Sequence, residues 1–91
     1  MDNLTEFQRD LLYIITGSDQ PSGQDVSDEI TDYYDEEVNN GRLYPNLDTL
    51  AEMNLITRGE QDGRTNYYEI TDTGLEVIHE RREWEEQYVD F

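Results

Sequence analysis

The spacing of apolar residues changes along this chain, from a helical repeat to short β-prone runs and back to a helical repeat. In residues 43–50, three leucines recur at i, i+4 and i+7, the spacing that puts side chains on one face of a helix. Two β-prone runs follow, at 55–60 and 65–70, and the Asp62-Gly63 pair between them is a strong hairpin-turn signal. The fold must therefore attach one hairpin directly to a helical unit.

Two more helices are predicted before the leucine repeat. Thr5 and Gln8 have the spacing of a capping box, and apolar residues then recur at helical spacing, which predicts a helix over 5–16. The turn cluster SDQPSG interrupts this pattern. Apolar residues at i, i+4 and i+7 or i+8, with acids on the other face, then predict a second helix over 23–37.

The third and last helices have recognisable ends. The third is expected to begin near Gly41 and to end near Asn54, since asparagine tolerates the left-handed conformation of a helix C-cap. Pro45 is expected in its first turn, where the missing amide had no partner within the helix. Thr71 and Asp72 can cap a last helix.

The order of these elements predicts the architecture. Three helices followed by a hairpin is the plan of a winged helix-turn-helix, in which the third helix enters the DNA major groove and the hairpin lies along the backbone. We therefore expect an α+β, mostly helical fold, with residues 1–71 forming the winged-helix domain and residues 72–91 a C-terminal dimerisation helix.

The charge of the chain is strongly and unevenly negative. There are 23 acids and 6 basic residues, all of them Arg, which give a formal net charge of −17. This composition is typical of proteins from halophiles, because in molar salt the Debye length falls to about 3 Å and carboxylates keep the surface hydrated. The net charge is −10 over residues 1–40, −2 over 41–70 and −5 over 71–91. The third helix and hairpin are thus the least negative part.

One polar face of the third helix is suited to reading DNA. Arg42, Asn46 and Thr49 stand at i, i+4 and i+7, away from the leucine stripe. Arg can bind guanine through two hydrogen bonds, Asn can bind adenine in the same way, and the Thr methyl can meet a thymine methyl. Beside the hairpin turn, Arg64 could reach a phosphate or a narrow minor groove. The alternative is an ordinary polar helix surface.

These stretches resemble the winged-helix signature of the PadR-type transcriptional regulators, over roughly residues 4–79. The matching residues are Ser22, Gly23, Gly41, Tyr44, Pro45, Leu47, Leu50, Tyr68, Ile70, Thr71 and Gly74. The resemblance implies a homodimeric, DNA-binding repressor that associates through its C-terminal helix, with Tyr44 and the wing near the phosphates. This sequence departs from the family pattern at Asp48, where a basic residue is frequent, and at Asn54, where glycine is usual. Its C-terminal region is also short.

Two sets of residues follow from this interpretation. The residues predicted to contact double-stranded DNA are Asn40, Gly41, Arg42, Tyr44, Asn46, Thr49, Arg64, Thr65 and Asn66. The last helix ends in three large aromatic residues that so small a chain can hardly bury, and such a stripe usually marks an interface. The residues predicted at a homodimer interface are Val77, Arg81, Trp84, Tyr88 and Phe91. Packing back onto the first helix is the alternative.

Enzymatic chemistry is not expected. The sequence has no cysteine and a single histidine, His79, and it has no Gly-rich phosphate loop, so we expect neither a metal site nor a cofactor. Because no apolar run is long enough for a signal peptide or membrane span, the prediction is a cytoplasmic protein. Two alternatives stay open: an apolar effector between the last helix and the core, and an acidic protein-interaction module or DNA mimic on the same fold.

Overall fold

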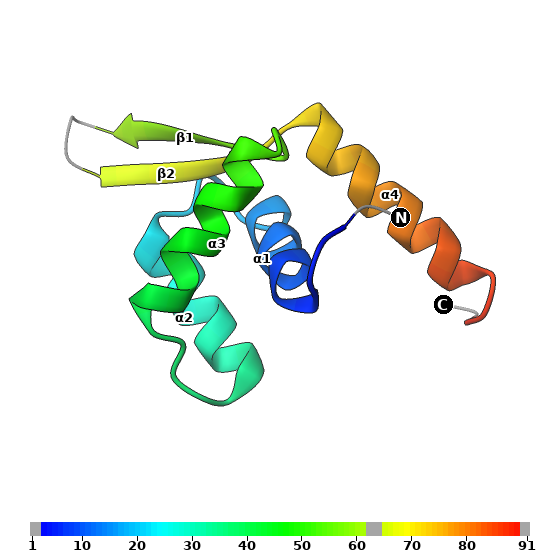
Figure 1. The fold of residues 1–91 in the computed structure, drawn as a ribbon, viewed down its shortest axis with the longest axis horizontal. Coiled ribbons are helices and arrows are strands. Elements are labelled where there is room, and N and C mark those ends of the chain that lie inside the picture. Colours follow the sequence, from blue (N-terminus) through cyan, green and yellow to red (C-terminus); the bar gives the residue numbers. More distant parts are fainter. Residues whose placement is uncertain (1–2, 62–64, 90–91) are drawn as a thin grey trace.

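The computed structural model describes residues 3–61 and 65–89, and it has the predicted α+β, mostly helical, winged-helix architecture (Figure 1). Three helices pack together, a two-stranded hairpin projects from them to one side, and the last helix leaves toward the other side. The elements are α1 (Glu6–Thr16), α2 (Gly23–Tyr34), α3 (Asn40–Glu52), β1 (Ile56–Gln61), β2 (Thr65–Ile70) and α4 (Asp72–Glu86).

The first two helices begin where local signals place them. Thr5 and Gln8 form both bonds of a capping box, each with a donor–acceptor distance of 3.1 Å, so that prediction is confirmed. Helix α2 ends at Tyr34, three residues before the end predicted for 23–37. It stops there because Asp35 adopts the left-handed conformation, with φ 54° and ψ 34°, which a continuing helix cannot contain.

The start of α3 corrects the position expected for its proline. The Oδ1 of Asn39 accepts a hydrogen bond from the amide of Arg42 at 2.9 Å, so Asn39 is the N-cap and Asn40 the first helical residue. Pro45 is therefore the sixth residue of the helix and lies in its second turn, so the first-turn prediction was wrong. Having no amide hydrogen, Pro45 cannot donate to the carbonyl of Gly41.

The hairpin is confirmed, and it is anchored to the linker between α1 and α2. Strands β1 and β2 are antiparallel, in a register that pairs Ile56 with Ile70 at the base. The amide of Tyr68 donates to the carbonyl of Pro21 at 2.9 Å, and Tyr67 forms an isolated bridge with the residue that follows this proline. The predicted turn pair Asp62-Gly63 lies outside the described residues.

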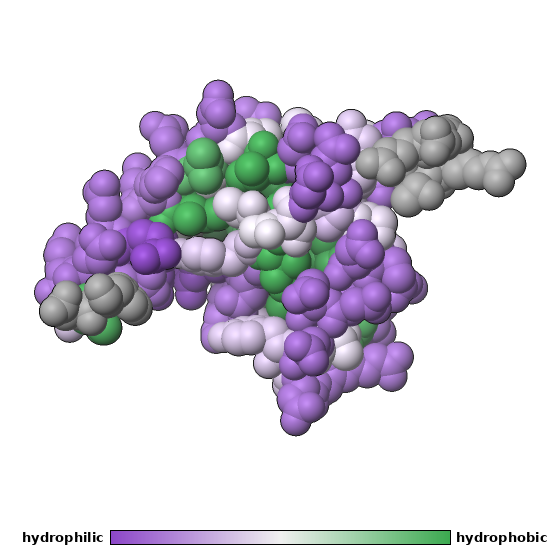
Figure 2. Space-filling model, turned by 180° about the vertical axis from the view of Figure 1, so that it is seen from behind, coloured by the Kyte–Doolittle hydropathy of each residue, from purple (hydrophilic) through white to green (hydrophobic). Residues whose placement is uncertain are grey.

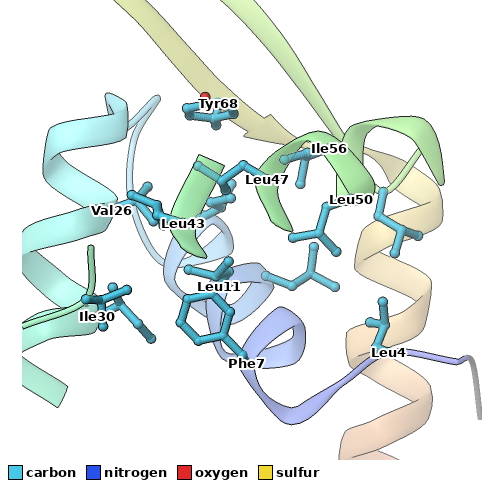
Figure 3. Close-up of a cluster of buried hydrophobic side chains, with 14 of the residues drawn as sticks. Leu4, Phe7, Leu11, Val26, Ile30, Leu43, Leu47, Leu50, Ile56 and Tyr68 are labelled. Atoms are coloured by element: carbon cyan, nitrogen blue, oxygen red, sulfur yellow. The ribbon is translucent and has the colours of Figure 1, made fainter. Parts of the chain in front are cut away.

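The core gathers under α3, where all three helices of the body and the base of the hairpin meet (Figure 3). The leucines of the predicted stripe, 43, 47 and 50, are each 0% exposed. They pack among fully buried residues of the other elements, which include Leu11, Leu12, Ile15, Val26, Ile30, Ile56 and Tyr68. The removal of this apolar surface from water is the main contribution that fixes α3 against α1 and α2. The opposite side of α3 stays exposed to solvent.

The junction between α3 and α4 is held by a polar contact and a close approach. Asn54 has φ 62°, which confirms the left-handed helix end predicted there. The Thr71 hydroxyl donates to the carbonyl of Asn54 at 2.7 Å, and Thr71 also caps α4. A Cβ on Gly74 would collide with the carbonyl oxygen of Leu55, so only glycine lets α4 start this close to the end of α3.

Candidate nucleic-acid interface

The side of α3 opposite the leucine stripe is exposed to solvent. Gly41, Pro45 and Glu52 lie on this side at i, i+4 and i+11, and all three are exposed. Asp48 is exposed on the flank that faces the hairpin. Because Gly41 has no side chain and Pro45 a short ring, the first turns of the helix can approach another surface closely. A groove of DNA is a surface of the right shape for such a helix.

Tyr44 lies at the junction of α2 and α3. Its side chain is 37% exposed, and its ring packs over Gly23, the first residue of α2. A Cβ at Gly23 would stand 2.5 Å from the Tyr44 hydroxyl oxygen, so this glycine makes room for the ring. The hydroxyl is therefore held at the N-terminal end of α2, beside the exposed start of α3.

Arg42 is held on an aromatic platform that the sequence did not reveal. Its guanidinium carbon lies 4.0 Å from the ring centroid of Phe7 and 5.7 Å from that of Tyr34. The Tyr34 hydroxyl donates to Oδ2 of Asp10 at 2.7 Å. Burial, followed by this hydrogen bond, raises the pKa of Tyr34 to about 12. Arg42 is thus exposed at the edge of α3 but not freely mobile.

Asn46 faces α1. Its Oδ1 accepts from Nε2 of Gln8 at 3.0 Å, and its Nδ2 donates to the carbonyl of Arg42 at 2.7 Å. An amide with these two bonds keeps one N–H and one lone pair for other partners, so reading of a base by Asn46 stays a prediction. Thr49, the third residue of the predicted reading face, is half-buried and donates its hydroxyl to the carbonyl of Pro45 at 3.0 Å.

Asp48, the acid at a position where the family often has a base, forms an ion pair with the wing. Nη1 of Arg58 on β1 lies 3.3 Å from its Oδ1, and both side chains are about half exposed. Arg58 also pairs with Tyr68 in the strand register. Burial raises the pKa of Tyr68, while the hydrogen bond and charge of Arg58 act in the opposite direction. Arg58 thus connects the exposed flank of α3 to the core.

The predicted wing residues are only partly within the described structure. Arg64 lies outside it, and Thr65 is described only by its backbone, which pairs with Gln61. Asn66 is exposed, opposite Glu60. Farther down the hairpin, the ring of Tyr67 lies across Gly59, where any Cβ would collide with it.

The predicted interface residues of the last helix differ in their exposure and in their place along the helix. Trp84 is 48% exposed and Tyr88 71%, with ring centroids 5.1 Å apart, but α4 ends at Glu86, so Tyr88 lies beyond it. Arg81 lies over the Trp84 ring at 4.6 Å. Val77 packs against the protein's own core. Phe91 is outside the described residues. On the face turned away in Figure 1, apolar side chains reach the surface along the start of α4 and beside α1 (Figure 2).

Residues 3–61 and 65–89 contain no group of three or more potential metal ligands, and none of their helices is long and apolar enough to cross a membrane. His79 is exposed. A hollow of about 330 Å³ opens between α1 and α2, lined by Asp10, Tyr13, Ile14, Glu29 and Tyr33. The apolar effector beside the last helix stays a prediction.

The sequence pattern does not reveal the residues that position the interface side chains, because these residues lie far from them in the sequence. Gln8 was recognised as a capping residue, but its second bond, to Asn46, joins positions 38 residues apart. Phe7 belongs to the apolar repeat of the first helix, and that repeat does not indicate its contact with Arg42. Arg58 lies in the first β-prone run, and its partner Asp48 is ten residues away. None of these pairings has a local spacing signal, and only an unexplained acid at position 48 hinted at a basic partner.

Comparison with known proteins places this geometry in a family. Residues 11–80 match the transcriptional regulator PadR-like family. RosR of H. salinarum, in crystals grown from NaBr, is 39% identical, with 98% of this chain and 81% of that chain covered and a TM-score of 0.88. The complex structure of hsRosR-S1 is 40% identical, covering 93% of this chain and 75% of that chain, with a TM-score of 0.88.

A bacterial structure is similar as well. A PadR-like transcriptional regulator from Bacillus cereus is 28% identical, covers 86% of this chain and 80% of its own, and has a TM-score of 0.74. Among proteins with curated functions, none matches the sequence significantly. The chain therefore belongs to the PadR-like family of transcriptional regulators, which are DNA-binding proteins and not enzymes.

Proposed function

We propose that this regulator is a repressor that binds double-stranded DNA as a homodimer at high salt. The observation that carries the proposal is the exposed side of α3 around Gly41 and Pro45, which lies beside the hairpin in the arrangement that winged-helix proteins use on DNA. In this proposal α3 enters the major groove, with Tyr44 and the wing at the phosphates. Repression needs no further surface, because a dimer seated on a promoter excludes other proteins from the same DNA.

The residues proposed to contact DNA differ in how far neighbouring residues fix their side chains before binding. Arg42 is positioned by Phe7, which reduces the side-chain entropy that binding would cost. Tyr44 is positioned by its packing over Gly23. Asn46 would need only its remaining N–H and lone pair to reach a base edge.

High salt is part of the proposal because of the acidity. Release of counterions from DNA contributes little free energy in molar salt. The exposed acids of α2, among them Asp25, Asp28 and Asp32, would then lie near DNA without the steep repulsion expected at low salt. We propose that cations are taken up between such carboxylates and the phosphates, so that binding persists in molar KCl.

The homodimer is proposed to form through the last helix. The exposed aromatic pair Trp84 and Tyr88 supports this, because aromatic side chains are enriched at protein–protein interfaces. Two recognition helices related by a two-fold axis would reach successive major grooves. Their half-sites would then be about 10 bp apart, or a multiple of that.

A gel-shift assay with the DNA upstream of its own gene, in molar KCl, tests the proposal. The acidic interaction module is the rival, and Arg42→Ala and Arg64→Ala separate the two. A repressor should lose DNA binding in these variants, whereas an acidic module that binds a basic protein should be indifferent to them. Circular dichroism of the Arg42 variant checks that removing the contact with Phe7 leaves the fold intact.

A further inference from the structure

We propose that Asp48 reads the exocyclic amine of a cytosine in the major groove, while Arg58 holds its carboxylate and offsets its charge. This inference rests on the proposed function, because it assigns a specificity role within the same surface. Asp48 would otherwise be an anomaly, since a carboxylate on the DNA-facing helix of a regulator repels the phosphates it must approach.

The geometry leaves one carboxylate oxygen available. Arg58 Nη1 binds Oδ1 of Asp48 at 3.3 Å, and no other residue of the described chain hydrogen-bonds to Oδ2. The Asp48 side chain is 54% exposed. Its neighbours Gly41 and Pro45 project little, so Asp48 is well placed to extend from this part of α3 into a groove.

The chemistry of the major groove selects the base. A carboxylate accepts only, so it needs a donor, and the major-groove donors are the amines of cytosine N4 and adenine N6. The adenine amine is flanked on one side by the acceptor N7 and on the other by the thymine O4. The cytosine amine has an acceptor on one side only, the guanine O6, and a C–H on the other. A carboxylate that approaches from the C–H side meets cytosine without repulsion.

Arg58 makes this reading compatible with DNA. Its guanidinium has five N–H donors, of which the bond to Asp48 uses one, and Arg58 lies directly opposite Tyr68 in the strand register. Its positive charge offsets that of the carboxylate near the phosphates. Arg58 is thus a positioning residue for Asp48, held in place by a tyrosine that is itself 1% exposed.

Selection of binding sites from random double-stranded DNA in molar KCl, with the intact chain, tests the inference. The wild-type protein should enrich cytosine at one fixed position of each half-site. Asp48→Ala should lose the preference at that position alone, by about fivefold or more. Asp48→Asn should replace cytosine by adenine there, because an amide can both donate to N7 and accept from N6. Glu52→Gln, which removes a charge from the same helix at a residue that forms no ion pair with Arg58 in the described structure, should keep cytosine.

The outcomes separate the possible failures. If both Asp48 variants keep the wild-type base preferences at every position, the inference is overturned while the proposed function stands. It is overturned in the same way if Asp48→Asn and Glu52→Gln raise affinity alike without changing the preferred bases, because Asp48 is then only a charge. If the wild-type protein enriches no sequence, sequence-specific binding fails and the inference with it.

Two Arg58 variants test the positioning role. Arg58→Ala should weaken the preference for cytosine, and Arg58→Lys, which keeps the charge beside the carboxylate, should restore most of it. A merely structural role of Arg58 would lower affinity for all sequences equally and leave the preference unchanged. That result would overturn the positioning role.

Discussion

Gln8 on α1 donates through Nε2 to the Oδ1 of Asn46 on α3, at 3.0 Å. The same side chain accepts a hydrogen bond from the amide of Thr5 through Oε1 at 3.1 Å, so one buried side-chain amide both caps α1 and binds α3. Asn46 in turn donates to the carbonyl of Arg42. The start of α1 and the exposed edge of α3 are therefore coupled by one chain of hydrogen bonds.

Replacing Gln8 should destabilise the fold. Gln8→Leu keeps the size of a side chain that is 8% exposed but removes both of its side-chain hydrogen bonds. The Oδ1 of Asn46 then loses its donor. We expect a loss of about 1–2 kcal/mol in the free energy of unfolding, measured by urea denaturation in molar KCl. Gln24→Leu is the control, because Gln24 is exposed and its side chain bonds only Asp28 among the described residues. This variant should cost less than about 0.5 kcal/mol.

Filling the space at Gly23 should displace Tyr44 and weaken DNA binding. In Gly23→Ala the new methyl group meets the end of the Tyr44 ring, which is exposed enough to move aside. The fold should survive, and the affinity for the selected site should fall about tenfold, or about 1.4 kcal/mol. Gly17→Ala is the matched control, because a Cβ there makes only ordinary contacts. Equal affinity of the two variants would show that Tyr44 does not contact DNA.

Tyr34 should make stability depend on pH in the alkaline range. Its pKa is raised from 10.0 to about 12 by burial and by the bond to Asp10. The folded protein keeps this proton after the unfolded chain has lost it, so the stabilisation is complete below pH about 10 and is lost as the pH rises toward about 12. Thermal unfolding across this range should show the fall in wild-type protein. Tyr34→Phe should show a shallower fall, and identical profiles would contradict the assignment.

Trp84 should control self-association. Trp84→Ala removes an aromatic side chain that is 48% exposed and contacts the ring of Tyr88 at a tilted angle. If it is central to the interface, the dimer should weaken by about 2 kcal/mol, roughly thirtyfold, in sedimentation measurements at molar KCl. Tyr33→Ala removes an exposed aromatic from α2 and should leave the dimer intact. A wild-type protein that stays monomeric at high concentration would exclude the proposed homodimer.

Local signals predicted most of the fold. The Thr5 and Gln8 capping box, the leucine stripe of α3 and the β-prone runs each act over a few residues, and the structure has all of them. The two errors are also local. Asp35 ends α2 early because it adopts a left-handed conformation that aspartate tolerates but does not require. Helix α3 starts at Asn40, one residue before the start expected near Gly41, so Pro45 lies in the second turn.

The candidate site was less predictable, because its side chains are positioned by distant partners. The helical repeat predicts which face of α3 carries Asn46 and Arg42. It does not predict that Gln8 bonds Asn46 or that Phe7 packs against Arg42. The same holds for Asp48. Its negative charge alone argues against DNA binding, and the sequence does not indicate that Arg58 on β1 pairs with it. Spacing indicates which side chains share a face, whereas their partners depend on how whole helices pack.

Binding of the DNA upstream of its own gene as KCl is raised to molar concentration tests the central claim most directly. Fluorescence anisotropy with wild-type protein and with Tyr44→Ala would give both affinity and its salt dependence. The account predicts that wild-type affinity persists in molar KCl and that Tyr44→Ala is weaker throughout. A steep decline, with a slope of about −0.9 per neutralised phosphate in a plot of log affinity against log salt, would contradict it.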